Sequence, residues 1–262
     1  MEKIDINLVK KVALSAAYQG SKILNSKFGK HIEIIKKGEI DLVTEADREC
    51  ENAIIRTINH HFPDHSILAE ETGLHKTSSI FKWIIDPLDG TTNFAHGIPI
   101  FSISIAFSIN DDIIFGVVLN PVLGELFTGE KGKGASLNGK TIRVSETKTV
   151  SNSLLVTGFP YNFKEIFSPL LIRFSNCIKA AQGIRRLGSA SLDLCFVACG
   201  RFDCFFEQNL KPWDTAAGLI IAEESGANVT DFSNMPYNVY KNEVLATNNK
   251  IHDEMISLLR LD

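Results

Sequence analysis

The stretch "WIIDPLDGTTNF", Trp83–Phe94, joins an apolar run to two aspartates, a glycine and two threonines. The apolar run predicts a buried strand. Burying a carboxylate without a partner costs several kcal/mol. Asp86 and Asp89 are therefore either ordinary turn residues beyond the end of a strand or ligands of a cation.

The residues after Asp86 predict a turn that gathers polar groups. The proline that follows biases Asp86 toward an extended backbone. A turn there brings the Asp86 and Asp89 side chains and the Leu88 carbonyl to one side of the chain. Gly90 and Thr91 then offer successive backbone N–H groups at the start of a short helix, and the N-terminus of a helix attracts anions. The stretch thus predicts cation ligands beside a phosphate-binding turn.

Antiparallel strands are predicted on the C-terminal side of this stretch. In "IFSISIAFSI", Ile100–Ile109, large apolar residues alternate with serine and alanine, a period of two that indicates a strand. The small residues on one face favour a closely packed helix there. Further strands are expected at Ile113–Leu119 and "GELFTGE", and Asn138-Gly139 is typical of a hairpin turn.

Helices are predicted around this sheet, and the pattern changes near residue 150. Helical spacing runs from Ile6 to about Phe28 and from about Glu45 to His61, with two short extended pieces between them. After residue 150, strand-like and helical segments alternate, which favours an α/β arrangement. The fold class is α+β followed by α/β, divided as residues 1–147 and 148–262 within one compact unit.

Composition excludes several classes of protein. The 262-residue chain has a net charge of −4, which argues against direct nucleic-acid binding. The N-terminus lacks a signal-peptide pattern, and no apolar run approaches the roughly 18 residues of a membrane span. Five cysteines without a CxxC pair indicate buried reduced thiols, which suits a cytoplasmic protein.

Other acidic residues lie where strands end or helices begin. Glu70 and Glu71 follow an apolar stretch, and Asp214 opens a strongly periodic helix, where aspartate also serves as an N-cap. Asp41 and Asp47 flank a threonine and are equally consistent with solvated surface acids. If several of these carboxylates converge, their repulsion needs a cation, and oxygen-only ligands favour Mg²⁺, Mn²⁺ or Ca²⁺ over zinc.

The segments "DPLDGTTNFAHGIP" and "KPWDTAAGLIIAEESG", with "AEE" upstream and "GSASLDLCFVACGRFDCFFE" between them, resemble the inositol monophosphatase family. The likeness covers essentially the whole chain, and "RRLGSASLDLCFVACGRFDCFFEQNLKPWD" is similar to the bacterial inositol-1-monophosphatase branch. The resemblance implies a layered αβαβα sandwich and Mg²⁺-dependent hydrolysis of phosphate monoesters by metal-activated water. It also implies a homodimer.

The resemblance also assigns roles to residues of this sequence. Glu70, Asp86 and the Leu88 carbonyl would hold a first Mg²⁺, and Asp86, Asp89 and Asp214 a second, with Glu70 touching a weaker third ion. Mn²⁺ would substitute for Mg²⁺. The remaining roles are those of phosphate and substrate contacts and of groups that orient the attacking water: Gly90 and Thr91 for phosphate, Asp89, Ala190 and Glu207 for substrate, and Thr91, Asp47 and Glu70 for the water.

The substrate is left open between members of the family. An inositol-1-phosphate phosphatase that releases myo-inositol is the leading prediction. Fructose-1,6-bisphosphatase, histidinol-phosphate, NADP and nucleotide 3′-phosphatase activities are the alternatives, because Lys211 and "TGFPYNF" differ from the animal enzymes. A different class of function is a binding role, since some members of the bacterial branch contact the transcription machinery.

Overall fold

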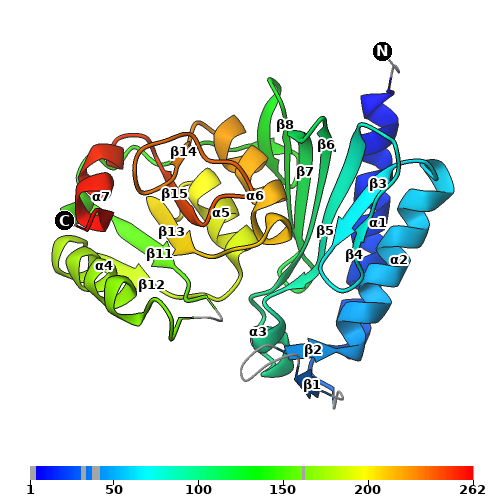
Figure 1. The fold of residues 1–262 in the computed structure, drawn as a ribbon, viewed down its shortest axis with the longest axis horizontal. Coiled ribbons are helices and arrows are strands. Elements are labelled where there is room, and N and C mark those ends of the chain that lie inside the picture. Colours follow the sequence, from blue (N-terminus) through cyan, green and yellow to red (C-terminus); the bar gives the residue numbers. More distant parts are fainter. Residues whose placement is uncertain (1–3, 31–33, 37–41, 161–162, 262) are drawn as a thin grey trace.

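The computed structural model describes residues 4–30, 34–36, 42–160 and 163–261, and it stacks helices and sheets in five layers (Figure 1). This order confirms the predicted αβαβα sandwich. Two helices cover the outer face of each sheet and two lie between the sheets. In layer order the helices are α1 (Ile6–Lys27) and α2 (Glu45–His61), then α5 (Ala190–Ala198) and α6 (Pro212–Glu224), then α4 (Phe167–Ala180) and α7 (His252–Leu259).

The first sheet has eight strands in the order β10-β9-β8-β7-β6-β5-β3-β4. All its neighbouring strands are antiparallel except β3 and β5, which run parallel. The antiparallel region between residues 100 and 141 is therefore as predicted. The strands are β3 (Ser66–Ala69), β4 (Gly73–His75), β5 (Phe81–Asp89), β6 (Ser102–Ile109), β7 (Asp112–Asn120), β8 (Glu125–Glu130), β9 (Gly134–Leu137) and β10 (Lys140–Thr141).

The two faces of β6 explain the layer order. Its large apolar side chains, such as Ile103 and Phe107, are buried against α1 and α2. Its serines and Ala106 face the inner helices, and Ser104 Oγ donates to the Trp213 carbonyl at 3.3 Å. The small-residue face thus carries a closely packed helix, as the sequence predicted. The contact depends on Gly116 of β7, where a Cβ atom would lie 2.8 Å from the Ala217 carbonyl oxygen of α6.

The second sheet has five strands in the order β12-β11-β13-β15-β14. β11 runs parallel to β12 and β13, while β15 is antiparallel to β13. The alternation of strands and helices predicted after residue 150 therefore yields a mixed sheet. The strands are β11 (Leu154–Thr157), β12 (Gly183–Arg185), β13 (Cys204–Gln208), β14 (Asn228–Thr230) and β15 (Glu243–Thr247).

The two sheets share the helix layer between them. One apolar cluster joins Ile84 and Phe127 of the first sheet, Leu194 and Ile220 of α5 and α6, and Phe205 of the second. The division into residues 1–147 and 148–262 stays a prediction. Within the described ranges, no helix is long and apolar enough to cross a membrane.

Short elements complete the chain. β1 (Ile34–Lys36) and β2 (Leu42–Thr44) pair antiparallel, in line with the two extended pieces predicted there, and Asp41 between them lies outside the described residues. The helix α3 (Thr91–Ala95) begins directly after β5, and η1 (Val150–Asn152) precedes β11. The strand β5 does not end at Asp86. It continues to Asp89, with an irregular register against β6 between these two residues. The turn therefore forms as a distortion of the strand end.

Candidate active site

One cavity of about 500 Å³ opens where β5, β13 and α6 meet. Its wall joins segments that are far apart in the sequence, because the ends of strands from both sheets and the starts of α3, α5 and α6 lie around it. Every site residue predicted from the sequence except Asp47 lines this cavity: Glu70, Asp86, Leu88, Asp89, Gly90, Thr91, Ala190, Glu207 and Asp214.

Asp86 is buried at the centre of the acidic wall. Its Oδ1 accepts a hydrogen bond of 2.9 Å from the Leu88 N–H, which closes the turn around the proline. Burial raises the pKa of Asp86 well above its ordinary value, and the charges of Glu70, Asp89 and Asp214 raise it further. These causes show that four carboxyl groups lie within electrostatic reach of one another in a region shielded from water.

Asp89 is held by hydrogen bonds from residues at the start of α5. Its Oδ2 accepts three hydrogen bonds: from Ser189 Oγ at 2.7 Å, from Ser191 N at 2.8 Å and from Ser191 Oγ at 2.6 Å. Burial raises the pKa of Asp89, and these hydrogen bonds oppose the rise. The first turn of α5 thus fixes the end of β5, about a hundred residues earlier in the chain.

Gly90 and Thr91 form the turn between β5 and α3. Gly90 has φ of 98°, and a Cβ atom there would lie 3.0 Å from the Ile100 carbonyl oxygen, so only glycine fits. Thr91 Oγ1 lies 3.1 Å from both Asp47 Oδ1 and the Leu88 carbonyl oxygen. A hydroxyl has one proton, so Thr91 donates to one of these two acceptors at a time.

Asp47 lies beneath this turn on α2 and is fully buried. The alternative reading of Asp47 as a solvated surface acid is therefore wrong. Glu70 follows β3 directly, and its N–H donates to the Ile85 carbonyl of β5 at 3.2 Å. Parallel pairing of β3 with β5 thus places Glu70 beside Asp86, because adjacent parallel strands end at the same edge.

Asp214 both stabilises the start of its helix and lines the cavity, the two readings that its position suggested. The helix α6 begins at Pro212, so Asp214 is its third residue and not its N-cap. Its Oδ2 accepts a hydrogen bond of 2.6 Å from the Lys211 N–H, which stabilises the first turn of the helix. The residue also lines the cavity and contributes to the raised pKa of Asp86.

Glu207 of β13 and Ala190 of α5 line the same cavity, close enough for Asp214 and Asp89 to act on the charge of Glu207. Burial raises the pKa of Glu207 to about 8; the charge of Asp214 adds to the rise and that of Arg186 opposes it. The Glu207 carboxylate reaches the cavity past Gly158, where a Cβ atom would lie 2.1 Å from Glu207 Oε2. Ala190 is the first residue of α5, and Lys211 and Arg186 add positive charge to this wall.

The donor set fits a hard divalent cation. The acidic centre offers only carboxylate and carbonyl oxygens, which are the ligands that Mg²⁺ prefers. Among the described residues, no three Asp, Glu, His or Cys side chains form a compact metal-binding group. Carboxylates that repel one another are expected to stay apart, and a cation among them would remove the repulsion that raises the pKa of Asp86.

Some residues that build the site were not predicted. Ser189 and Ser191 hold Asp89, and Asn93 Nδ2 donates to the Leu187 and Ile100 carbonyls at 2.7 Å each, which ties α3 to the segment before α5. The segment "GSAS" is only a weak indication of this role, because a serine before a helix is usually an N-cap. Local sequence does not show that these serines bind Asp89 of β5.

The chain is similar to known proteins over nearly its whole length. The model of the inositol monophosphatase family matches residues 5–260. An inositol-1-monophosphatase of Synechocystis is 43% identical over 257 residues, 97% of this chain and 90% of the relative. A protein of Haemophilus influenzae named Nus factor SuhB is 38% identical, with 97% of each chain covered.

Solved structures agree with this likeness. The extragenic suppressor protein suhB of Bartonella henselae superposes with a TM-score of 0.93 at 37% identity, over 97% of this chain and 98% of that chain. An inositol monophosphatase of Anabaena gives 0.88 at 40% identity, over 98% and 96%. The chain therefore belongs to the inositol monophosphatase family, whose members are metal-dependent phosphatases.

Proposed function

We propose that this phosphatase hydrolyses inositol 1-phosphate to myo-inositol and phosphate and that Mg²⁺ is its metal. The observation that carries the proposal is the group of oxygen ligands around Asp86, whose pKa is raised by burial and further by three neighbouring carboxylates. Glu70, Asp86 and the Leu88 carbonyl would hold one ion, and Asp86, Asp89 and Asp214 a second. Bound divalent cations neutralise phosphate charge and lower the pKa of water.

The residues around the metal ligands would position the phosphate and the water. Gly90 and Thr91 line the cavity at the start of α3, and their backbone N–H groups would donate to phosphate oxygens. The Thr91 hydroxyl would donate to Asp47, which leaves its oxygen free to accept a hydrogen bond from the attacking water. Glu70 would take one proton from that water as its oxygen attacks phosphorus, and the second proton stays on the new P–O–H group. The bond to the leaving oxygen breaks at the same step, without a phospho-enzyme, and the leaving oxygen takes a proton from solvent.

The wall formed by Ala190 and Glu207 would select the leaving group. A carboxyl with a pKa of about 8 is mostly protonated at neutral pH, so Glu207 can both donate to and accept from hydroxyl groups. That pairing suits a polyhydroxylated ring such as a cyclitol. Arg186 and Lys211 lie on the same wall, and their positive charges would suit a second anionic group on the substrate. A sugar or nucleotide substrate with such a group is therefore the alternative.

A panel of phosphate monoesters tests this proposal. Phosphate release would be measured with Mg²⁺ for inositol 1-phosphate, fructose 1,6-bisphosphate, histidinol phosphate, NADP and a nucleotide 3′-phosphate. We expect the highest kcat/KM for inositol 1-phosphate and none of this activity in the Glu70→Gln variant. Equal activity in the variant, or full activity in excess chelator, would contradict the metal mechanism. If kcat/KM for another ester is ten times higher than for inositol 1-phosphate, that ester is the substrate and the proposed one is wrong.

We also propose that the protein is a homodimer. The resemblance to the family suggests it, and exposed apolar side chains on α4 offer a surface that a second copy could cover: Phe167, Leu171 and Ile178 on one face of the helix, with Ile172 exposed beside it. Light scattering at micromolar concentration should give twice the mass of the chain. A monomer mass would overturn this proposal without affecting the catalytic one.

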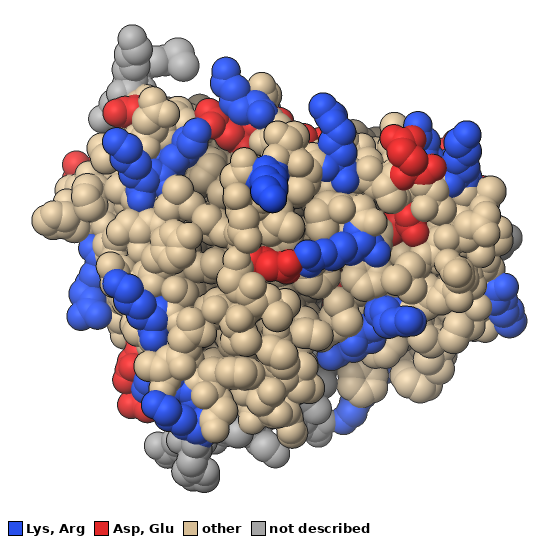
Figure 2. All heavy atoms as spheres, turned by 180° about the vertical axis from the view of Figure 1, so that it is seen from behind, with Lys and Arg blue, Asp and Glu red and all other residues tan. Residues whose placement is uncertain are grey.

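A second candidate function is binding to a protein of the transcription machinery. A relative named Nus factor SuhB, which is 38% identical over nearly the whole chain, supports it. On the face seen in Figure 2, lysines and arginines are scattered alone or in small groups over a mostly neutral surface, so this face offers no continuous basic strip for nucleic acid. A pull-down with the Glu70→Gln variant separates this role from catalysis, because binding should persist without turnover.

A further inference from the structure

Glu51 is a buried acid on α2 that the catalytic proposal does not use. It follows Asp47 by one helical turn, so both side chains lie on the same face of the helix. Only 1% of its surface is exposed. Its carboxylate must therefore have a partner within the protein, because an unpaired buried charge is costly.

The partners of Glu51 are two successive backbone N–H groups next to Glu70, together with the Thr72 side chain. Glu71 N donates to Glu51 Oε2 at 2.9 Å, and Thr72 N donates to Glu51 Oε1 at 2.9 Å. A carboxylate accepts both, since each oxygen faces one N–H. An amide side chain cannot, because its NH₂ group would face one of the donors. The geometry therefore requires an acidic residue at position 51.

These hydrogen bonds act where the sheet gives little support. Glu70 lies between β3 and β4, and β4 is the edge strand of the eight-stranded sheet. On its N-terminal side Glu70 is fixed by its own N–H bond to the Ile85 carbonyl. On its C-terminal side the bonds from Glu71 and Thr72 to Glu51 fix the chain.

We propose that Glu51 is a positioning residue that holds the backbone after Glu70, so that the Glu70 carboxylate meets the metal and the attacking water. The helix α2 would then position two catalytic groups from one face, Thr91 through Asp47 and Glu70 through Glu51. This inference rests on the proposed roles of Glu70 and Thr91. Glu51 itself touches neither metal nor substrate.

The test compares Glu51→Gln with Glu49→Gln, the same change two residues away on the same helix. Glu49 is exposed, and its Oε1 pairs with Lys27 Nζ at 3.0 Å, away from the segment after Glu70. Three quantities would be measured for each variant: hydrogen exchange of the Glu71 and Thr72 amides, the Mg²⁺ concentration at half-maximal thermal stabilisation, and kcat.

We expect Glu51→Gln to speed amide exchange at both positions and to raise the Mg²⁺ midpoint by about tenfold or more, the usual effect of removing a residue that orients a ligand. Its kcat should fall by a similar factor, while Glu49→Gln matches wild type. A purely structural role would lower the melting temperature and leave the Mg²⁺ midpoint unchanged, and that result would refute the proposal.

Two further outcomes keep the proposals separate. If Glu51→Gln does not fold, the wild-type protein decides: slow exchange of the Glu71 and Thr72 amides supports the proposal, and exchange at free-chain rates refutes it. If wild type shows no Mg²⁺-dependent phosphatase activity, the proposed function fails. If wild type is active and Glu51→Gln behaves like Glu49→Gln, only the role of Glu51 fails.

Discussion

Replacing Asp86 by asparagine separates a cation site from a structural cluster of acids. The side chain is buried, and its only hydrogen bond within the described residues, to the Leu88 N–H, ends on Oδ1. Asparagine keeps that acceptor and the size of the side chain, so the substitution removes the charge alone. The charge is repelled by Glu70, Asp89 and Asp214.

The expected magnitude follows from that repulsion. Two unit charges 4 Å apart repel by about 4 kcal/mol at an effective dielectric near 20. Asparagine removes this repulsion but leaves a polar side chain buried, so we expect Asp86→Asn to raise the unfolding free energy in chelator by about 2 kcal/mol, half of that figure. For a chain of this size that is roughly 4 °C or more in melting temperature.

The pH dependence has a definite sign. The pKa of Asp86 is raised in the folded protein, so its contribution to stability is full at low pH and is lost as pH rises through the folded pKa. The advantage of Asp86→Asn over wild type should therefore grow with pH. Saturating Mg²⁺ should reverse the order, because binding at 100 times Kd adds about 2.7 kcal/mol to wild type.

The assay is thermal melting of both proteins with chelator and with Mg²⁺ at several pH values. Asp89→Asn is the matched control, since it makes the same change of charge but weakens three charge-assisted hydrogen bonds from Ser189 and Ser191. Its gain in chelator should be smaller. If Asp86→Asn melts lower than wild type in chelator, and Mg²⁺ shifts both proteins equally, the converging carboxylates do not form a cation site.

Three other changes test separate parts of the structure. Thr91→Val removes the hydroxyl that bonds Asp47 and should lower kcat about 10²-fold in a phosphate-release assay; a loss below threefold would remove Thr91 from the mechanism. Glu207→Gln should flatten the fall in metal-free stability between about pH 4.5 and pH 8, since the pKa of Glu207 is raised to about 8. Identical pH profiles in calorimetry would contradict this. Gly116→Ala should destabilise by about 1–3 kcal/mol in urea unfolding, because its Cβ would meet the α6 backbone, and an unchanged midpoint would disprove the close contact.

Local patterns in the sequence were sufficient to predict most elements of the fold. The alternation of large and small residues in β6 correctly predicted a helix packed on its small face, and the motif from Trp83 to Phe94 marked the acidic edge of the cavity. These predictions succeed because periodicity and turn preferences depend on a few neighbouring residues.

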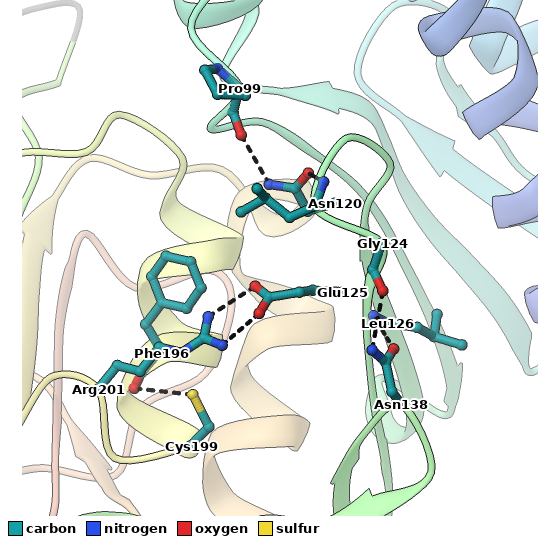
Figure 3. Close-up of polar contacts among 10 residues, drawn as sticks. Pro99, Asn120, Gly124, Glu125, Leu126, Asn138, Phe196, Cys199 and Arg201 are labelled. Atoms are coloured by element: carbon teal, nitrogen blue, oxygen red, sulfur yellow. Dashed lines mark hydrogen bonds and ion pairs between the residues drawn. The ribbon is translucent and has the colours of Figure 1, made fainter.

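One contact between the layers was not predicted from the sequence. Arg201, after α5, forms an ion pair with Glu125 at the start of β8 and stacks on Phe196, as Figure 3 shows. This contact joins the inner helices to the first sheet. Nothing in either local sequence indicates the other partner, since the two residues are 76 positions apart.

The tertiary structure decided which contacts hold the side chains together in the cavity. Residue patterns left Asp47 and Asp214 open between ordinary and functional readings, and the family resemblance assigned both to the site without showing what holds them there. Packing of α2 beneath β5 buried Asp47 against Thr91, and packing of α6 brought Asp214 to the acidic wall while it stabilised its own helix. A local pattern sets the direction of a side chain on its own element, but its partner depends on how the layers stack, and that is fixed by apolar contacts between distant segments.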